Sequence, residues 1–295
     1  KYKKNLNLII YKQVIYVADN LGYIYAIDLD KKVLKWAQNY GIPFRSNIKI
    51  YDDKLFLSNQ DNTLYSLNIN NGEKYWQYDT SSSFLKSDFQ NNLLIDKTNK
   101  FLFFLNTSGE LYAIDLINNK VIWVNNFKRS SNTESNLFIS FPLSLKNENL
   151  LIYDGKKILN LNSKTGIKNW ETNLSLETKP VLTSNNVFFV TKNNYLICLN
   201  MIDGKIIWSK NIDNQIKILR EKFNTSNLGL FKSQFIVNNF ILLFTSSGYL
   251  LTFDISNGKI LTVNKILKNQ IGKNQIFANQ SLYLLDKKNR LFKFN

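Results

Sequence analysis

The chain has 295 residues with no histidine and one cysteine, so it can build no Ser-His-Asp triad, imidazole metal site, internal disulfide or cysteine-rich cluster. Its formal net charge of +16 comes from 38 basic and 22 acidic residues. Only four of the basic residues are arginines, and the lysines are scattered along the chain, whereas nucleic-acid readers gather arginine on one face. We therefore expect no nucleic-acid partner, and no apolar run approaches the ~20 residues of a membrane-spanning helix.

The first recognisable element is a five-residue apolar block that ends in Asp or Asn, Ile24–Asp28. The block occurs seven times, at residues 24–28, 64–68, 111–115, 158–162, 196–200, 250–254 and 291–295. Successive copies lie 38 to 54 residues apart, and blades of β-propellers repeat every ~40–50 residues. The spacing therefore indicates a repeat protein of the propeller type.

Each block belongs to a unit with the same order of signals. Two short apolar runs precede it, as Ile48–Tyr51 and Lys54–Leu57 precede the second block, and a turn with Asn or Gly follows. In five copies a tryptophan then stands eight residues after the block: Trp36, Trp76, Trp123, Trp170 and Trp208. The pattern predicts four short antiparallel strands per unit and an all-β fold, a β-propeller of four-stranded blades.

The predicted blades form a single β-propeller domain over residues 1–295. They span approximately residues 5–40, 47–80, 84–127, 137–174, 179–212, 228–266 and 270–295. The five tryptophans are expected to dock between neighbouring blades, since a ligand site would use one or two special aromatic residues rather than one in nearly every unit. Cys198 takes the small-residue position of the fifth block and is expected to be a buried thiol.

The run Gly109–Asp115 followed by Trp123 resembles the tryptophan-docking repeat of the PQQ-like, quinoprotein-type propellers, and the resemblance covers essentially the whole chain. One branch, the PQQ-dependent dehydrogenases, implies a quinone, calcium and a vicinal disulfide, which the lone Cys198 cannot form. Calcium also takes several carboxylates, whereas the acids here are mostly single turn residues such as Asp28 and Asp254. We therefore expect no catalytic residue, metal or cofactor, and no enzyme. A PQQ-dependent oxidoreductase-like propeller is kept as an alternative.

The C-terminal repeat is similar to another branch, the BamB-like lipoproteins of outer-membrane β-barrel assembly. Residues 247–259, with Thr262 in the tryptophan position, look like the penultimate blade of that family. The resemblance implies a non-enzymatic scaffold that binds the POTRA domains of the barrel protein BamA and aids outer-membrane protein assembly and insertion. It implies a lipoprotein at the periplasmic face of the outer membrane. A generic propeller adaptor with an unknown partner is the second alternative.

The BamB-like family has eight blades, whereas seven blocks are visible and the last unit lacks an outer strand after Asn295. We therefore expect an upstream blade or closing strand ahead of Lys1, together with a signal peptide and a lipid-anchored cysteine. A seven-bladed ring closed by the Lys1 end is the alternative.

The loops are the expected binding elements, because the strands are committed to packing. The family binds its partner through inter-blade loops with a leucine and arginine pair, and that segment falls on Ser83–Asp88. The resemblance makes Phe84 and Leu85 the apolar anchor, with Lys86 in the place of the arginine and Asp88 beside them. Lysine lacks the planar fork of arginine, and an ordinary loop that packs on its own blade is the alternative.

The longest insertion lies between Asn211 and Ser233. Ile216, Leu219 and Phe223 follow one another at helical spacing. The spacing predicts a helical turn with these three residues on one face, as a lid over the propeller or as a second contact site.

Overall fold

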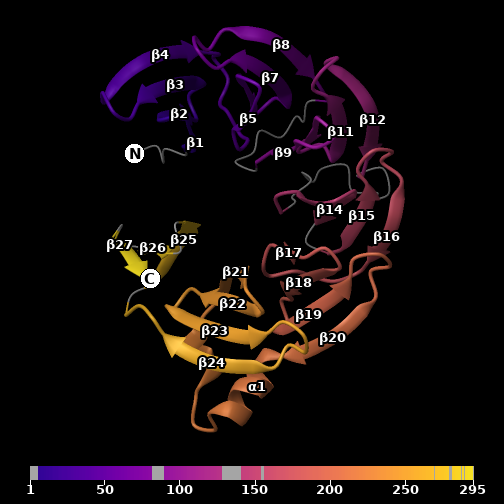
Figure 1. Ribbon diagram of the computed structural model, residues 1–295, viewed down its shortest axis with the longest axis vertical. Helices are drawn as coiled ribbons and strands as arrows, with labels where there is room; N and C mark the ends of the chain where they lie inside the picture. The colour runs from indigo at the N-terminus through magenta and orange to yellow at the C-terminus, as the bar shows by residue number, and fades with distance from the viewer. Residues whose placement is uncertain are drawn as a thin grey trace. The chain divides into compact units, whose positions relative to one another are not determined.

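The computed structural model describes residues 6–81, 90–127, 141–153, 156–268, 270–278, 281–286, 288 and 290–294. These residues form 27 β-strands, one α-helix and one short 3-10 helix, and Figure 1 labels the strands and the α-helix. The chain divides into two compact units, Lys1–Asp154 with Leu161–Lys168 and Gly155–Asn160 with Asn169–Asn295.

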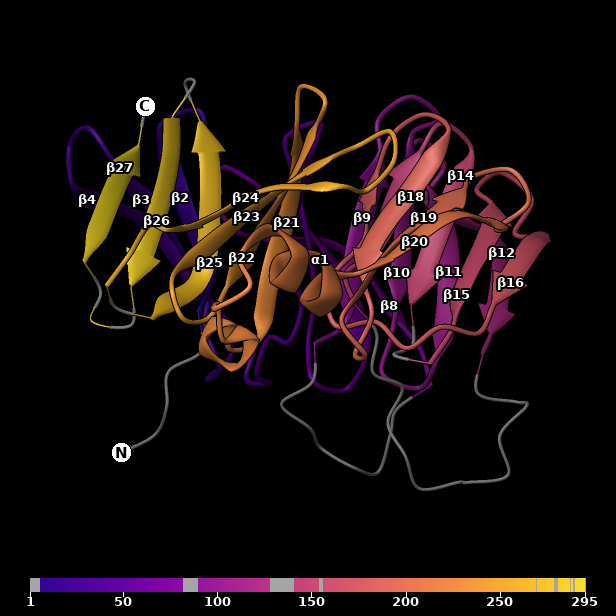
Figure 2. The same ribbon diagram turned by 90° about the horizontal axis from the view of Figure 1, so that it is seen from below.

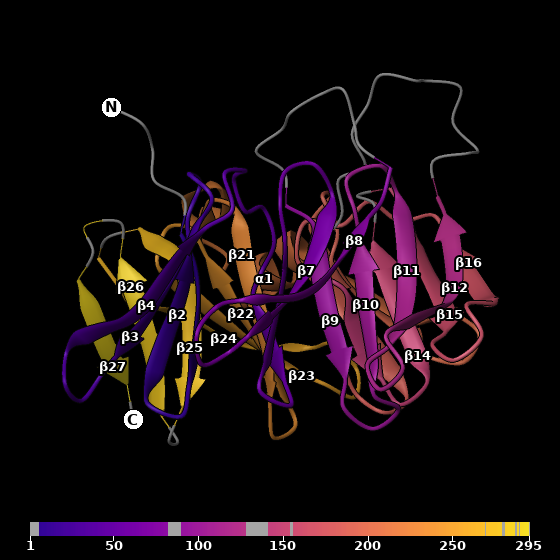
Figure 3. The ribbon, with the colours of Figure 1, turned by 90° about the horizontal axis from the view of Figure 1, so that it is seen from above.

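The first unit contains three four-stranded antiparallel sheets whose strands follow one another in chain order. The first sheet consists of β1 (Asn7–Tyr11), β2 (Val14–Ala18), β3 (Tyr23–Asp28) and β4 (Val33–Asn39). The second consists of β5 (Lys49–Tyr51), β6 (Lys54–Ser58), β7 (Thr63–Asn68) and β8 (Lys74–Asp79). The third consists of β9 (Asn92–Asp96), β10 (Phe101–Leu105), β11 (Glu110–Asp115) and β12 (Lys120–Asn126). Figure 3 shows β9, β10 and β11 side by side.

The fourth sheet consists of β13 (Ser144–Lys146), β14 (Asn149–Tyr153), β15 (Ile158–Asn162) and β16 (Lys168–Thr172). Within the second unit, the fifth sheet consists of β17 (Val181–Leu182), β18 (Asn186–Val190), β19 (Tyr195–Asn200) and β20 (Ile206–Asn211). The sixth consists of β21 (Phe231–Val237), β22 (Phe240–Thr245), β23 (Tyr249–Asp254) and β24 (Ile260–Lys265). The last sheet has three strands in the described residues, β25 (Ile271–Ala278), β26 (Ser281–Asp286) and β27 (Leu291–Phe294).

The repeated block forms the third strand of each sheet, and in five sheets the fourth strand contains the tryptophan. Where the register is resolved, the tryptophan lies opposite the small middle residue of the block, as Trp36 lies opposite Ala26 and Trp208 opposite Cys198. A register shift follows each of these pairs. Because directly opposite residues share one face of a sheet, a small side chain at the block position leaves room for the indole.

Both faces of the inner strands are buried, which accounts for their nearly continuous apolar sequences. In the second sheet, Leu55 packs in one core with Tyr16 and Ala26 of the first sheet. The next residue along the strand, Phe56, points to the opposite face and packs with Leu102 of the third sheet. Alternate residues of one strand therefore join it to a neighbour on either side.

The insertion after β20 forms the helix α1 (Ile212–Leu219) and the 3-10 helix η1 (Thr225–Leu228). The helical turn expected from the sequence is present, but α1 ends at Leu219, so Phe223 lies beyond the helix. Ile212 and Ile216 are the buried residues of the helix, and Leu219 is 43% exposed. In the described residues no helix is long and apolar enough to cross a membrane.

Candidate partner-binding loop and its support

The predicted partner-binding residues Phe84, Leu85, Lys86 and Asp88 lie in the segment 82–89, outside the described residues. Both ends of this segment are described, from Ser81 on one side and from Gln90 on the other. The role of the four residues stays a prediction. The structure describes the residues on either side of this segment and the hydrogen bonds that hold them.

Hydrogen bonds hold the residues that lead into the loop. The Ser81 hydroxyl donates to Glu110 Oε1 at 2.7 Å, and its carbonyl oxygen accepts from Asn62 Nδ2 at 2.9 Å and from the Ser108 hydroxyl at 3.0 Å. The Thr80 hydroxyl donates to the Asn62 carbonyl at 2.8 Å. These bonds join the end of β8 to the turn between β6 and β7 and to the β10–β11 hairpin, so the entry to the loop has a fixed position.

Asn91 fixes the residues that leave the loop. This side chain is almost fully buried, and Nδ2 donates to the Ser58 hydroxyl at 2.9 Å and to the Asn59 carbonyl at 3.1 Å. Its Oδ1 accepts from the backbone N–H of Thr107 at 3.0 Å, and its own N–H donates to the Arg45 carbonyl at 2.7 Å. Because both the oxygen and the nitrogen of this buried amide form hydrogen bonds, the side chain stabilises one arrangement of the chain.

Glu110 is the charged member of this network. Its carboxylate accepts from Ser81, from Asn106 Nδ2 at 2.9 Å and from the Tyr112 hydroxyl at 2.9 Å. Partial burial opposes the charge, but the hydrogen bonds from Ser81, Asn106 and Tyr112 outweigh it and hold the pKa of Glu110 below its usual value. Burial and the neighbouring carboxylate raise the pKa of Tyr112. At neutral pH the network therefore contains a carboxylate that accepts from a neutral phenol.

The turns between β10 and β11 and between β6 and β7 share one construction that the sequence analysis did not use. The side chain of Asn106 accepts from the backbone N–H groups of Ser108 and Glu110, and Asn59 accepts from Asp61 and Thr63. The sequence signal for this turn is the Asn that follows the second strand of the unit, as Asn59 and Asn106 do. The contacts that join these turns to Asn91 and Ser81 come from distant parts of the chain and leave no local signal.

Four tryptophans donate their indole N–H to a turn of the following sheet. Trp36 donates to the Ile69 carbonyl at 3.1 Å, Trp123 to the Ser163 carbonyl at 3.1 Å and Trp170 to the Met201 carbonyl at 2.8 Å. Trp76 donates instead to the Asn119 side chain at 3.1 Å. That these contacts dock neighbouring blades to one another stays a prediction.

A glycine in the turn makes close approach of the ring possible. Gly72 has a φ of +74°, and a Cβ atom added to it would lie 2.5 Å from the ring of Trp36. Trp208 lies equally close to Gly258. The turn residue that faces the tryptophan ring must therefore lack a side chain, since Cβ atoms essentially never approach other atoms within 3.0 Å. Asn119, which also has a positive φ, replaces the glycine opposite Trp76.

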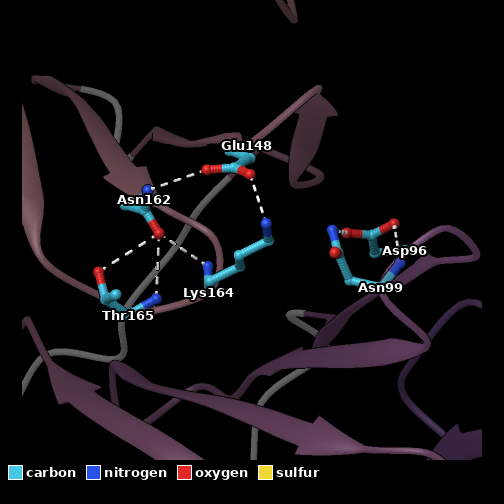
Figure 4. A network of polar contacts seen from close by, with 6 residues as sticks. All are labelled: Asp96, Asn99, Glu148, Asn162, Lys164 and Thr165. Atoms are coloured by element: carbon cyan, nitrogen blue, oxygen red, sulfur yellow. Dashed lines mark hydrogen bonds and ion pairs between the residues drawn. The ribbon is translucent and has the colours of Figure 1, made fainter.

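A hollow of about 660 Å³ lies between the β9–β10 turn and the β13–β14 turn of the first unit. Figure 4 shows a network of polar contacts beside it: Lys164 pairs with Glu148 at 2.5 Å, and Glu148 also accepts from Asn162. The hydrogen bond from Lys164 and its charge lower the pKa of Glu148. Asp96 accepts from Asn99 Nδ2 at 2.7 Å. Both carboxylates are therefore engaged with neighbouring side chains.

Metal-ligating groups and the single thiol complete the inventory of reactive side chains in the described residues. These residues contain no group of three or more His, Cys, Asp or Glu side chains that could hold a metal ion. Cys198 is almost fully buried, and burial raises the pKa of its thiol to about 12. A protonated, buried thiol is neither a nucleophile nor a metal ligand at neutral pH.

Comparison with known proteins identifies relatives of this chain. Residues 11–210 match the family model described as "Outer membrane protein assembly factor BamB". Among curated proteins, the outer membrane protein assembly factor BamB of Legionella pneumophila (strain Paris) is 25% identical over 177 residues, which cover 57% of this chain and 44% of the relative. The chain thus aligns with less than half the length of that curated relative.

Solved structures identify the fold. BamB from Moraxella catarrhalis matches with a TM-score of 0.75 and 14% identity over 98% of this chain and 83% of that one. Sqt1 of Saccharomyces cerevisiae matches with a TM-score of 0.70 and 10% identity, over 96% of this chain and 80% of that one. Sequence identities this low establish the fold alone. The structural matches confirm the predicted all-β propeller built of four-stranded antiparallel blades.

Proposed function

The chain belongs to the family of the outer membrane protein assembly factor BamB, and from this premise we propose that it is a non-enzymatic scaffold in outer-membrane protein assembly. The family match over residues 11–210 is the observation that carries the proposal. In this role the chain binds the POTRA domains of a BamA-like barrel assembly protein and aids insertion of outer-membrane proteins. It acts at the periplasmic face of the outer membrane, held there by a lipid anchor on a cysteine upstream of Lys1.

The proposed contact is the loop with Phe84, Leu85, Lys86 and Asp88. Its support is consistent with a binding loop, because Ser81 and Asn91 are both hydrogen-bonded to neighbouring turns. A loop whose ends are already fixed loses less conformational entropy when it binds. The apolar pair supplies the buried anchor of the contact, and Lys86 supplies its charge.

The proposal also gives the propeller a structural role. We propose that residues 1–295 form one domain in which Trp36, Trp76, Trp123, Trp170 and Trp208 dock successive blades. The chemistry of a calcium–quinone centre does not fit the described residues, which contain no cluster of carboxylates for the metal. No observation in the structure favours the oxidoreductase alternative.

Co-purification with the POTRA domains of a BamA-like protein tests the proposal. The double variant Leu85→Asp with Lys86→Glu is expected to lose the partner, because it removes an apolar anchor and reverses a charge. A matched control is Ile117→Asp with Lys120→Glu, which makes the same changes at exposed residues elsewhere in the first unit. The control is expected to retain the partner, and both variants should keep the circular dichroism of the parent chain.

Two results would count against parts of the proposal. If the parent chain fails to capture the partner, the proposed assembly role is wrong. If the parent chain captures it and the loop variant does so equally well, the role stands and the loop is not the contact.

A further inference from the structure

The insertion after β20 contains α1 (Figures 1 and 2). It places exposed apolar side chains among basic ones in the second unit. We propose that its exposed segment, Lys217–Lys222, binds the surface of a membrane that contains anionic lipid. This activity goes beyond scaffolding, because it needs no protein partner.

The helix is firmly attached to the sheet beneath it. Ile212 and Ile216 are fully buried in the core of the fifth and sixth sheets. Gln215 donates through Nε2 to the Gly258 carbonyl at 3.0 Å and accepts at Oε1 from the backbone N–H of Ile260 at 2.8 Å. At the first turn, the Asn211 side chain caps the helix by accepting from the N–H of Asn214. The segment after the buried residues therefore stands on a rigid base.

Every residue from 217 to 222 is exposed. Ile218 is 84% exposed and Leu219 is 43% exposed, and the same insertion exposes 59% of Leu230. A single exposed isoleucine is ordinary on a protein surface. Two adjacent apolar side chains between cations on a short helix form the pattern of an interfacial, membrane-associated segment.

The charges around these side chains favour an anionic surface. Lys217, Arg220 and Lys222 outnumber Glu221 within the exposed segment. The nearby acid Asp213 is already engaged, since its carboxylate accepts from Asn194 Nδ2 at 2.9 Å.

A fourth cation lies next to the insertion. The Lys265 ammonium lies 5.1 Å from the centre of the Tyr249 ring, and the Phe223 ring meets Tyr249 edge-on at 5.6 Å. Phe223 also lines a hollow of about 430 Å³ with Arg220, Glu221 and Lys222. Two cations outnumber the one carboxylate around this space, and with the aromatic ring they suit the phosphate and glycerol of a lipid headgroup.

The shape of the segment favours lipid over an acidic protein. Its apolar side chains stand outward on a single helical turn, and a protein partner would need a matching cavity to cover them. A bilayer needs no such cavity, because Ile218 can enter the headgroup region while the long Lys and Arg side chains extend to phosphates. We therefore assign the surface to a lipid bilayer.

Vesicle flotation tests the inference with the 295-residue chain and no partner protein. The probes are vesicles of phosphatidylethanolamine with phosphatidylglycerol, and vesicles of phosphatidylcholine alone. The chain is expected to float with the anionic vesicles, less so at high salt because salt screens the attraction, and not with the neutral ones. Arg220→Glu with Lys222→Glu should lower the partition coefficient at least about 25-fold, since each basic residue near an anionic surface contributes about fivefold.

Ile218→Asp and Ile202→Asp form a matched pair, because the two isoleucines are 84% and 81% exposed. The change at Ile218 is expected to weaken flotation about tenfold or more, and the change at Ile202 is expected to leave it unaltered. Failure of the parent chain to float, or equal flotation of Ile218→Asp and Ile202→Asp, would overturn the inference. So would loss of POTRA capture by the Arg220 and Lys222 variant with flotation intact, which would assign the surface to a protein. Because flotation involves no POTRA domain, its outcome is separate from that of the proposed assembly role.

Discussion

Alanine at Gly72 would place a methyl group against the ring of Trp36, whereas alanine at Gly41 would meet nothing within 4 Å. The two glycines have the same φ of +74°, so the backbone strain caused by a side chain is the same at both. The difference between Gly72→Ala and Gly41→Ala therefore measures the crowding of the added methyl group against Trp36 and Gln38.

The magnitudes follow from the geometry. A side chain in the left-handed region costs about 1–2 kcal/mol at either position. At Gly72 the added Cβ lies 2.5 Å from the ring and 2.8 Å from Cγ of Gln38, and relief of such crowding costs about 1–3 kcal/mol more. Displacement of the ring also breaks the bond from Trp36 Nε1 to the Ile69 carbonyl, for about 1 kcal/mol. We expect a loss of about 3–6 kcal/mol for Gly72→Ala and about 1–2 kcal/mol for Gly41→Ala.

Urea unfolding followed by tryptophan fluorescence and far-UV circular dichroism gives both free energies. A double variant, Gly72→Ala with Trp36→Ala, completes a thermodynamic cycle and is expected to be more stable than the sum of the single changes, because the clash is gone. Equal losses at Gly72 and Gly41, or additive effects in the cycle, would refute the argument that the turn is built around the ring.

Two further predictions concern titratable groups. Glu110→Gln is expected to lower the midpoint of thermal unfolding at pH 7; since the folded-state pKa of Glu110 lies below its usual value of 4.5, its stabilisation is complete above that value and is lost as the pH falls through the lowered pKa. The gap between parent and variant should therefore shrink between pH 5 and pH 3, and a gap independent of pH would contradict the role of the charge. Cys198, whose pKa burial raises to about 12, should resist DTNB at pH 8 in the native chain and react fully in urea, and rapid labelling of the native chain would show that the thiol is accessible.

Much of the fold could be predicted from the sequence because its repeat is local and periodic. The interval of eight residues from Asp28 to Trp36 reflects one hairpin, in which the turn and the two strands follow one another directly. The small residue at Ala26 was visible as a pattern, but its reason, the indole opposite it, needed the register. The same holds for Gly72, whose ring partner comes from the preceding repeat.

Other features could not be predicted, for physical reasons. Leu219 and Phe223 follow Ile216 at helical spacing, but the periodicity of a sequence does not reveal that α1 ends at Leu219. The network of Asn91, Ser81 and Glu110 depends on contacts between turns that are distant in the sequence. Phe84 and its neighbours were placed by resemblance to a family, and that placement stays a prediction.

The hydrogen bonds from Trp36, Trp123 and Trp170 to later turns have a consequence for the order in which the chain acquires structure. The acceptor of the indole N–H lies 33 residues after Trp36, 40 after Trp123 and 31 after Trp170. A hairpin that has emerged from a ribosome or a translocation channel can therefore form this hydrogen bond as soon as the next turn has emerged, without waiting for the C-terminus. Because each of these bonds joins consecutive repeats, the chain can fold from its N-terminus onward, and a late arrest of synthesis would leave the earlier bonds formed.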